Sequence, residues 1–336
     1  MKLAVVGAGY WGVNLVRVFH RLGVLGKICD FNLPRLKQLA AEYPDVMVDV
    51  LYQAVLDDPS LDAVVIATPA ETHYELAKQA LLAGKDVMVE KPMTLHCAET
   101  EDLISIAERS HRILMVGHLL EYHPAITRLQ CLIEQGELGR IEYIYSNRLN
   151  LGKVRREENA FWSFAPHDVS VILLLLKQLP VQVTATGGAY LQPNIADVTV
   201  STMLFNRGVR AHLFVSWLHP YKEQRLVVVG ERGMAVFDDV RKTEKLQLYD
   251  KKISLVDGQF IVDRPVGHAV DFPPDEPLLL ECRHFIECMQ TRQAPRTDGH
   301  DAWRVLKVMD ASQRSLSMNG EPVQLEAHRS LEIVRA

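Results

Sequence analysis

The sequence predicts an α/β protein of two consecutive domains, the first built on a parallel sheet and the second on a large, mostly antiparallel open sheet. Two observations support this prediction. Up to Gly117, short apolar strands alternate with helical patterns across short loops, as in a doubly wound parallel sheet. After His118, strand-like runs follow one another at the spacing of an antiparallel sheet. We therefore expect domains over residues 1–120 and 121–336.

In the first domain, each expected strand is followed by a helix or a turn signal. Strands are expected at Leu3–Val6, Lys27–Cys29, Asp62–Ala67, Lys85–Glu90 and Ile113–Gly117. The first helix should stop at Gly23, and Asn32 and Pro34 should open the second. Two more helices are expected at Thr72–Ala83 and Cys97–Arg109.

The second domain begins with a helix over Pro124–Gln135 and a strand over Ile141–Arg148. A polar loop leads from there to a helix that should start near Pro166. Further strands are expected at Val181–Tyr190, Val198–Phe205, Val209–Trp217, Arg225–Val229, Gly233–Asp238 and Leu246–Tyr249. Helices near Glu276–Thr291 and Gly299–Met318 should close the chain.

The composition excludes several classes of protein. Charged residues are 24% and hydrophobic ones 48% of the chain, which is typical of a globular protein. The net charge of −5 gives no sign of a nucleic-acid or membrane surface, and the run Val169–Leu176 is too short to span a bilayer. The 5 cysteines form no C-x-x-C pair, so we expect reduced thiols, no metal site and a cytoplasmic location.

The first strand runs into a glycine-rich turn that predicts a dinucleotide site. Gly7, Gly9 and Gly12 follow the strand Leu3–Val6 in G-x-G-x-x-G spacing. Such a turn places backbone N–H groups and a helix N-terminus where a pyrophosphate binds. Asp30, after the second strand, stands at the spacing expected of a carboxylate that binds the adenosine ribose. Because this carboxylate would repel a 2′-phosphate, we expect NAD as the cofactor rather than NADP.

Lys91 and His167 are the candidates for proton transfer. Ligands of open parallel sheets bind beyond the carboxyl ends of the strands, where Lys91 follows Glu90. A lysine there can hydrogen-bond a substrate hydroxyl beside the nicotinamide. His167 stands at the expected start of a helix and could exchange a proton near neutral pH. By residue type alone, a solvated turn lysine and an imidazole packed at a helix end are the plainer alternatives.

The ordered set of motifs resembles that of the glucose–fructose oxidoreductase / inositol dehydrogenase family (Gfo/Idh/MocA). The matching motifs are Gly7-x-Gly9-x-x-Gly12, Ala67-Thr-Pro-x-x-x-His73, Glu90-Lys91-Pro92, Gly117-His-Leu-Leu-Glu-Tyr-His-Pro124 and then His167. The resemblance covers essentially the whole chain and is weakest beyond Val240. It implies hydride transfer between a sugar or cyclitol carbon and nicotinamide. It also implies a Lys91–Pro92 bond that is often cis and an open sheet that often joins subunits.

The resemblance also assigns roles to single residues. Lys91 would fix and polarise the reacting hydroxyl while His167 acts as the base, or the two roles would be reversed. Cofactor contacts would come from Gly7, Gly9, Tyr10, Trp11, Gly12, Asp30, Thr68, Pro69, His73, Glu90, Lys91 and His118. Ser163 stands where the family often has an aspartate, so a Lys/Asp/His triad is not expected. Glu121 replaces a common arginine, which suggests a different polar contact to the substrate.

Two segments with several cations narrow the substrate. The loop from Arg148 to Asn159 and the segment from Trp217 to Arg225 resemble parts of family members that oxidise nucleotide-linked N-acetyl sugars. Arginine forks suit phosphate oxygens. The resemblance therefore implies oxidation of UDP-N-acetylglucosamine at its 3-hydroxyl, on the way to a diamino sugar of lipid A or lipopolysaccharide. The expected substrate contacts, besides Lys91 and His167, are Tyr122, Arg148, Lys153, Arg155, Arg156, Asn159, Trp162, Lys222 and Arg225.

Other interpretations remain open. The substrate could be UDP-N-acetylglucosaminuronate, or the chain could be a dehydrogenase of a free sugar or inositol. The alternative from a different class is a non-catalytic NAD-binding regulatory protein, against which the presence of both Lys91 and His167 speaks. The cations could instead form a solvated face or subunit contacts. As partners we expect a UDP-sugar and further copies of the chain, in a tetramer or a dimer, with no nucleic acid and no membrane.

Overall fold

The computed structural model describes residues 1–325, which form two compact units. The first unit consists of Met1–Tyr122 and Asp275–Leu306, and the second of His123–Pro274 and the residues from Lys307 on. The predicted boundary after residue 120 therefore lies close to a real one, but the prediction of two consecutive domains is wrong for Asp275–Leu306. This segment returns to the first unit because it buries apolar side chains in that unit's core.

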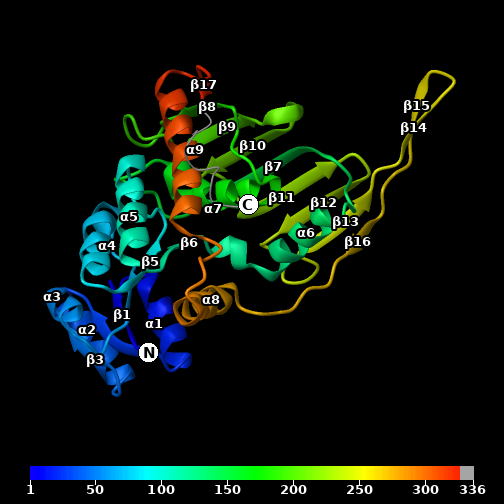
Figure 1. The fold of residues 1–336 in the computed structure, drawn as a ribbon. Coiled ribbons are helices and arrows are strands. Elements are labelled where there is room, and N and C mark those ends of the chain that lie inside the picture. Colours follow the sequence, from blue (N-terminus) through cyan, green and yellow to red (C-terminus); the bar gives the residue numbers. More distant parts are fainter. Residues whose placement is uncertain (326–336) are drawn as a thin grey trace. The chain divides into compact units, whose positions relative to one another are not determined.

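The first unit is built on a six-stranded sheet in the order β3-β2-β1-β4-β5-β6 (Figure 1). All of its strand pairs are parallel, as the alternation of strands and helices predicts. The strands are β1 (Leu3–Val6), β2 (Leu25–Cys29), β3 (Met47–Asp49), β4 (Ala63–Ile66), β5 (Asp86–Glu90) and β6 (Leu114–Gly117).

Helices cover both faces of this sheet because alternate strand residues point to opposite sides. Leu3 and Val5 pack in the cluster that contains α1, α2 and α8, whereas Ala4 and Val6 pack in the cluster that contains α3, α4 and α5. The helices are α1 (Gly12–Arg21), α2 (Leu33–Glu42), α3 (Gln53–Leu56), α4 (His73–Leu82), α5 (Cys97–Ser110), α8 (Pro277–Thr291) and α9 (Gly299–Ser317), with short 3₁₀ turns η1 (Ala70–Thr72) and η2 (Leu119–Tyr122).

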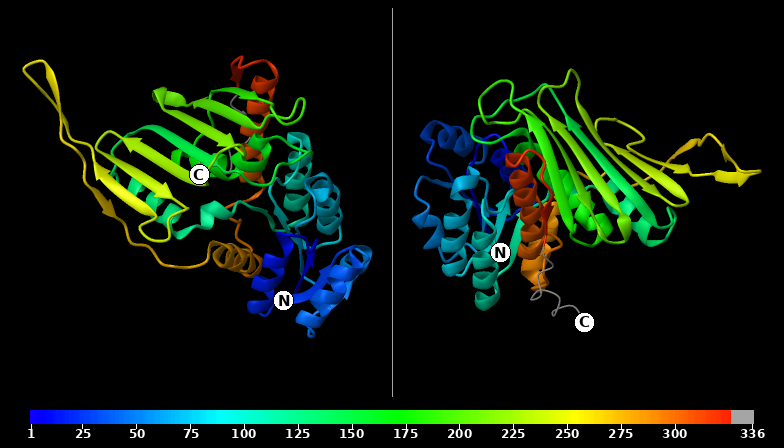
Figure 2. Two further views of the ribbon diagram at one scale, coloured as in Figure 1. Left: turned by 180° about the vertical axis from the view of Figure 1, so that it is seen from behind. Right: turned by 90° about the horizontal axis from the view of Figure 1, so that it is seen from above.

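The second unit is built on a nine-stranded sheet in the order β16-β13-β12-β11-β7-β10-β9-β8-β17 (Figure 2). Its pairs are antiparallel except for β10 with β7, so the predicted mostly antiparallel sheet is confirmed. The strands are β7 (Ile141–Leu149), β8 (Gln182–Gly188), β9 (Val198–Leu204), β10 (Arg210–Ser216), β11 (Glu223–Gly230), β12 (Gly233–Asp238), β13 (Leu246–Asp250), β16 (Gly267–Ala269) and β17 (Val323–Gln324). The helical elements of this unit are α6 (Pro124–Glu134), α7 (Ala160–Leu176) and η3 (Asn206–Gly208), together with the end of α9.

The two faces of this sheet differ. The helix α7 packs on β7, β9 and β10, which gives one face its apolar cover. On the opposite face, Tyr145 of β7 stacks on His212 of β10 with ring centroids 5.4 Å apart, and Val200 of β9 is 44% exposed. One face is therefore open within the second unit.

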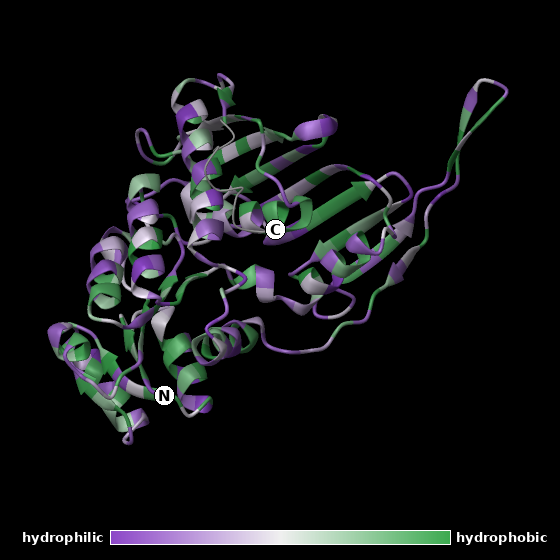
Figure 3. Ribbon diagram, viewed as in Figure 1, coloured by the Kyte–Doolittle hydropathy of each residue, from purple (hydrophilic) through white to green (hydrophobic). Residues whose placement is uncertain are grey.

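A hairpin that the sequence did not predict extends from this unit. The strands β14 (Ile253–Val256) and β15 (Gln259–Val262) pair only with each other, and every residue in them is exposed. In Figure 3 the hairpin shows both apolar and polar colours, whereas the strands of the six-stranded sheet are mainly apolar. The sequence nevertheless carries a signal that our prediction did not use, because Asp257-Gly258, both with positive φ, form a two-residue turn between apolar runs.

Two further findings concern membrane spans and cysteines. No helix within residues 1–325 combines the length and the apolar character that a membrane span requires. All 5 cysteines have free thiols, in line with the absence of a paired spacing in the sequence.

Candidate active site

The glycine-rich turn lies between β1 and α1, at the carboxyl edge of the parallel sheet. Gly7 has a positive φ of 87°, and a side chain there would meet the backbone of Ala67 at 2.8 Å. At Gly12 a β-carbon would lie 1.9 Å from the Gly7 carbonyl oxygen, so only glycine lets the helix approach the strand this closely. At Gly9, by contrast, a β-carbon would meet no atom within 4 Å. Gly7 and Gly12 therefore serve the fold, and the space beside Gly9 is open to a ligand.

Asp30 closes the turn from the end of β2. Its Oδ2 accepts a hydrogen bond from the backbone N–H of Ala8 at 2.7 Å, and its Oδ1 accepts one from Asn32 at 2.8 Å. These bonds fix the carboxylate beside the glycine-rich turn, at the place where a ribose would bind. The turn, the N-terminus of α1 and Asp30 thus fit a bound NAD.

Lys91 and Glu90 stand at the end of β5. Lys91 is half-buried, and its bond to Pro92 is cis, as the resemblance implies. The Glu90 carboxylate accepts a hydrogen bond from Trp11 Nε1–H at 2.5 Å. Burial raises the pKa of Glu90 to about 7, although Trp11 and the charge of Lys91 oppose the shift. Trp11 is thereby held against the strand end, and Tyr10, at 95% exposure, is the aromatic side chain of this turn that is open to contact.

His73 holds the ends of two neighbouring strands together. Its Nδ1 lies 2.8 Å from the carbonyl oxygen of Pro92, and its Nε2 lies 2.8 Å from that of Thr68. Burial lowers the pKa of His73 more than the two carbonyl oxygens raise it, so the neutral ring donates its single N–H to one of these oxygens at a time. His73 therefore links the turn after Lys91 to the segment of Thr68 and Pro69 that follows β4.

Two residues predicted as contacts are buried in the first unit. His118 is 2% exposed, and its Nδ1 lies 2.8 Å from Asp301 Oδ2, a partner that the sequence did not indicate. Tyr122 is 4% exposed, and its hydroxyl lies 3.1 Å from Thr297 Oγ1. The prediction of Tyr122 as a sugar contact is a poor fit to this position, because its ring belongs to the core.

His167 lies in the second unit, within α7 rather than at its start. The helix begins after Asn159, whose side chain accepts a hydrogen bond from Trp162 N–H, and Pro166 lies inside it. The expectation of a helix starting near Pro166 is therefore wrong, because Asn159 is the N-cap. His167 is half-buried, and Ser163 lies one turn earlier, where the family aspartate would stand.

Arg148 forms a buried ion pair that sequence reasoning missed. Its Nε lies 2.6 Å from Asp168 Oδ2, and its Nη2 lies 3.1 Å from Asp168 Oδ1. Ser146 also donates to Asp168, at 2.7 Å. Because one edge of the guanidinium, Nε and Nη2, binds the carboxylate next to His167, Arg148 anchors α7 to β7. This ion pair argues against the prediction that Arg148 is a phosphate ligand.

Of the other predicted cations, some form ion pairs and others are exposed. Arg225 binds Asp238 at 3.0 Å, and Arg155 lies 3.0 Å from Glu158. Lys153, Arg156 and Lys222 are exposed. The last three cations are the ones that a phosphate could reach without breaking an ion pair seen in residues 1–325.

The polar side chains of Asn159 and Trp162 also have protein partners. Asn159 Nδ2 donates to Gln313 at 2.8 Å while its Oδ1 caps α7. Trp162 Nε1 donates to the same Gln313 oxygen at 3.0 Å. The prediction of Asn159 as a sugar contact is thus at odds with its use as a helix cap, whereas the half-buried Trp162 ring keeps an accessible part.

The fold and the residues at the strand ends together define a class. A parallel sheet with a glycine-rich turn, a ribose-binding carboxylate and a lysine beyond the next strands is the construction of an NAD-dependent dehydrogenase.

The comparison with family models identifies the family. A model described as an oxidoreductase family with an NAD-binding Rossmann fold matches residues 1–118, and the GFO/IDH/MocA C-terminal domain matches residues 126–236. The chain belongs to the GFO/IDH/MocA family of NAD-dependent oxidoreductases.

The similarity to individual relatives extends over most of the chain. UDP-N-acetylglucosamine 3-dehydrogenase of Acidithiobacillus ferrooxidans is 30% identical over 91% of this chain and 94% of its own length. The solved structure of this dehydrogenase covers 95% of this chain and 98% of its own at a TM-score of 0.84 and 28% identity. The NAD-dependent scyllo-inositol 2-dehydrogenase of Bacillus subtilis is 27% identical over 82% of this chain and 81% of its own length.

Proposed function

We propose that this chain oxidises the 3-hydroxyl of UDP-N-acetylglucosamine to the 3-keto sugar. The observation that supports this most is the similarity to the Acidithiobacillus dehydrogenase, which is named for this reaction and matches 91% of this chain. The similarity to an inositol dehydrogenase over 82% of the chain supports the same chemistry on a different alcohol. Only the nucleotide sugar has a diphosphate, so binding of the diphosphate decides between these two substrates.

The reaction divides between cofactor and protein. When bound, NAD would supply the hydride acceptor, carbon C4 of its nicotinamide. The C3–H bond breaks with its electron pair, the O3–H bond gives its proton to the protein, and the C3–O bond becomes a carbonyl. Lys91 fixes and polarises the hydroxyl, and His167 takes the proton, with the reverse assignment as the alternative. The proposal requires that Lys91 and His167 reach the same hydroxyl group.

The diphosphate would bind cations of the second unit. Lys153, Arg156 and Lys222 are exposed and can turn toward a ligand. Arg155 and Arg225 already face carboxylates and are weaker candidates. We infer that the first three residues distinguish a nucleotide sugar from a free polyol.

The keto sugar is a substrate for transamination, and the resulting diamino sugar would serve lipid A or lipopolysaccharide. We further propose that the chain forms a homo-oligomer, a tetramer or a dimer, through the open face of the nine-stranded sheet. The stacked Tyr145 and His212 and the exposed Val200 on that face support this part.

The test is NADH formation from NAD and UDP-N-acetylglucosamine, followed by absorbance. A keto-acid acceptor or an aminotransferase should be present, because an unfavourable equilibrium can hide the product. We expect Lys91→Ala and His167→Ala each to lower kcat at least a hundred-fold. Lys37→Ala and His268→Ala remove exposed residues of the same types in the same two units and should leave kcat unchanged.

Each other result has a definite meaning. Turnover of UDP-N-acetylglucosaminuronate alone would keep the site and change the substrate. Turnover of free inositol or a free sugar, with no effect of UDP-sugars, would refute the nucleotide-sugar proposal. If NAD binds but no alcohol is oxidised and the Lys91 and His167 variants bind NAD normally, the protein is a regulatory NAD-binding protein.

A further inference from the structure

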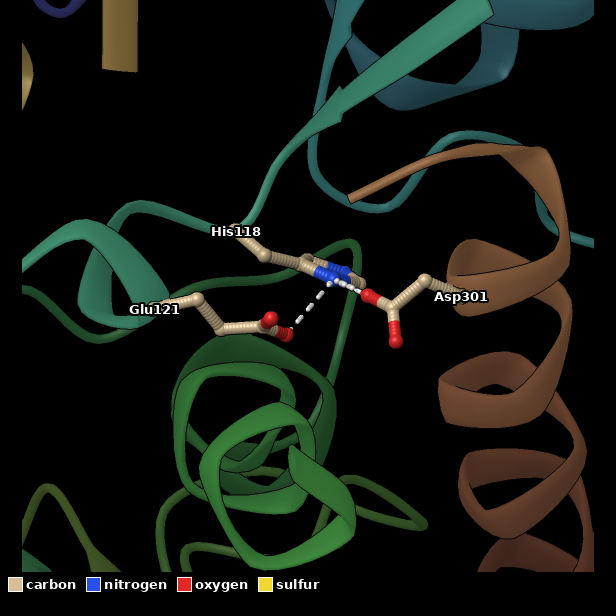
Figure 4. Close-up of side chains that lie close together, drawn as sticks. All are labelled: His118, Glu121 and Asp301. Atoms are coloured by element: carbon tan, nitrogen blue, oxygen red, sulfur yellow. Dashed lines mark hydrogen bonds and ion pairs between the residues drawn. The ribbon is translucent and has the colours of Figure 1, made fainter. Parts of the chain in front are cut away.

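We propose that His118, Glu121 and Asp301 bind one divalent transition-metal ion, Zn²⁺ or Mn²⁺, inside the first unit. This inference is independent of the proposed substrate. It also goes against the expectation of no metal, which rested on the cysteine pattern alone. Figure 4 shows the three side chains pointing toward a common centre.

The distances suit an ion. The ligand atoms all lie within 4.8 Å of one another. His118 Nδ1 is 2.8 Å from Asp301 Oδ2 and 3.8 Å from Glu121 Oε1. With metal–ligand bonds of about 2.0–2.2 Å, two ligands of a tetrahedral site lie roughly 3.3–3.6 Å apart. The observed separations fall on both sides of this range, so small side-chain rotations would form the site.

Three separate segments supply the ligands. His118 directly follows β6, Glu121 lies in η2, and Asp301 lies in the first turn of α9. His118 and Asp301 are 183 positions apart in the sequence, and both belong to the first unit. An ion at this point would tie the end of the parallel sheet to a segment that returns late in the chain.

Burial makes the cluster expensive without a cation. The side chains of His118, Glu121 and Asp301 are 3%, 1% and 4% exposed. Within residues 1–325, the buried Oε1 of Glu121 has no hydrogen-bond partner. Arg304 already balances the charge of Asp301, and a divalent cation would neutralise Glu121 and give its Oε1 a ligand bond.

The surrounding groups act as an outer layer. Arg304 binds Asp301 Oδ1 at 2.9 Å and leaves Oδ2 facing the cluster. Arg296 donates to the backbone carbonyl oxygen of Glu121 at 2.5 Å and therefore fixes the position of η2. Asp301 N–H donates to Asp298 at 2.8 Å. Hydrogen bonds of this kind orient the ligands in metal sites.

The donor set selects the ion. One imidazole nitrogen and two carboxylates suit Zn²⁺ and Mn²⁺, whereas Ca²⁺ prefers oxygen ligands alone and Cu⁺ prefers sulfur. Because all three ligands are buried, we assign the ion a structural role and no step of the oxidation.

The test uses full-length, tag-free protein that has been dialysed against a chelator. Calorimetric titration with ZnCl₂ and with MnCl₂ should show one ion bound per chain for at least one metal, with proton release and a higher Tm. Glu121→Gln and Asp301→Asn should each weaken the binding at least ten-fold. Glu108→Gln is the matched control, because it removes a carboxylate that lies 3.1 Å from a histidine, His300, in an exposed pair of the same unit.

Two outcomes would overturn the proposal. One is the absence of saturable binding of either ion to the wild-type chain. Another is binding that persists unchanged in both variants, because the ion would then lie elsewhere. Should Asp301→Asn unfold through the loss of its bond to Arg304, Glu121→Gln alone decides. A wild-type chain that binds no ion and is no more stable than Glu121→Gln would identify a shared proton in place of the metal.

Discussion

Replacing Arg148 by methionine decides between two explanations of one residue, a phosphate ligand and a structural anchor. The substitution keeps much of the side-chain length but removes the fork that binds Asp168 at 2.6 and 3.1 Å. The Arg148 and Asp168 side chains are only 10% and 6% exposed. The variant therefore leaves an ionised carboxylate buried without its counter-charge.

The expected loss of stability is large. Removing one partner of a buried ion pair costs about 3–5 kcal/mol, which is roughly a 10²- to 10⁴-fold change in the ratio of folded to unfolded chains. The pair of Lys177 and Glu134 in the same unit lies at 2.7 Å but is 64% and 45% exposed, so Lys177→Met should cost about 0–1 kcal/mol. The double variant Arg148→Met/Asp168→Leu should recover most of the loss, because no unpaired charge remains buried.

Urea unfolding followed by circular dichroism measures these differences, and the KM for the UDP-sugar is measured in parallel. The reasoning predicts a lower urea midpoint for Arg148→Met, with little change for Lys177→Met. An unchanged midpoint together with a ten-fold or larger rise in KM would refute it. Arg148 would then be the phosphate ligand that the sequence predicted.

The other predictions concern the cofactor side. Gly12→Ala should lower the Tm because its β-carbon meets the Gly7 carbonyl. Gly9→Ala should keep the Tm but weaken NAD binding at least ten-fold. Equal changes of Tm and of NAD affinity in the two variants would contradict this. Asp30→Ala should lower the ratio of kcat/KM with NAD to kcat/KM with NADP. An unchanged ratio would show that Asp30 does not select between the two cofactors. Burial raises the pKa of Glu90 from 4.5 to about 7, so its contribution to stability is complete below pH 4.5 and is lost as the pH rises through about 7. Urea unfolding at several pH values should show that the wild-type chain loses stability with rising pH relative to Glu90→Gln. Parallel plots of stability against pH for the two proteins would argue against this reasoning.

The sequence was informative where structure is local. The spacing of Gly7, Gly9 and Gly12 predicted the turn because Gly7 and Gly12 each stand at a close backbone contact within the β1–α1–β4 region, while Gly9 leaves space open beside the turn. Alternating strands and helices predicted the parallel sheet for the same reason. The return of Asp275–Leu306 could not be predicted, because the apolar face of α8 shows that it must be covered but not by which unit.

The sequence predicted which residues lie at the strand ends, but not the side chains that pair with the residues of the candidate site. Lys91, Glu90 and His118 do lie at strand ends, since chain order alone fixes the carboxyl edge. The burial of Arg148 could not be foreseen, because Asp168 contacts it only once α7 packs on β7. Pro166 suggested a helix start, yet the helix begins at the cap that Asn159 provides.

The late return of α8 has a consequence during synthesis. Leu278, Leu279, Cys282 and Phe285 complete the core around β1 and α1, but they leave the ribosome long after residues 1–122. Until then, one side of the nascent parallel sheet lacks part of its cover and presents apolar surface to its surroundings. The N-terminal segment should therefore need a chaperone or slow translation to avoid aggregation. A fragment ending at Tyr122 should precipitate unless α8 is supplied as a separate peptide.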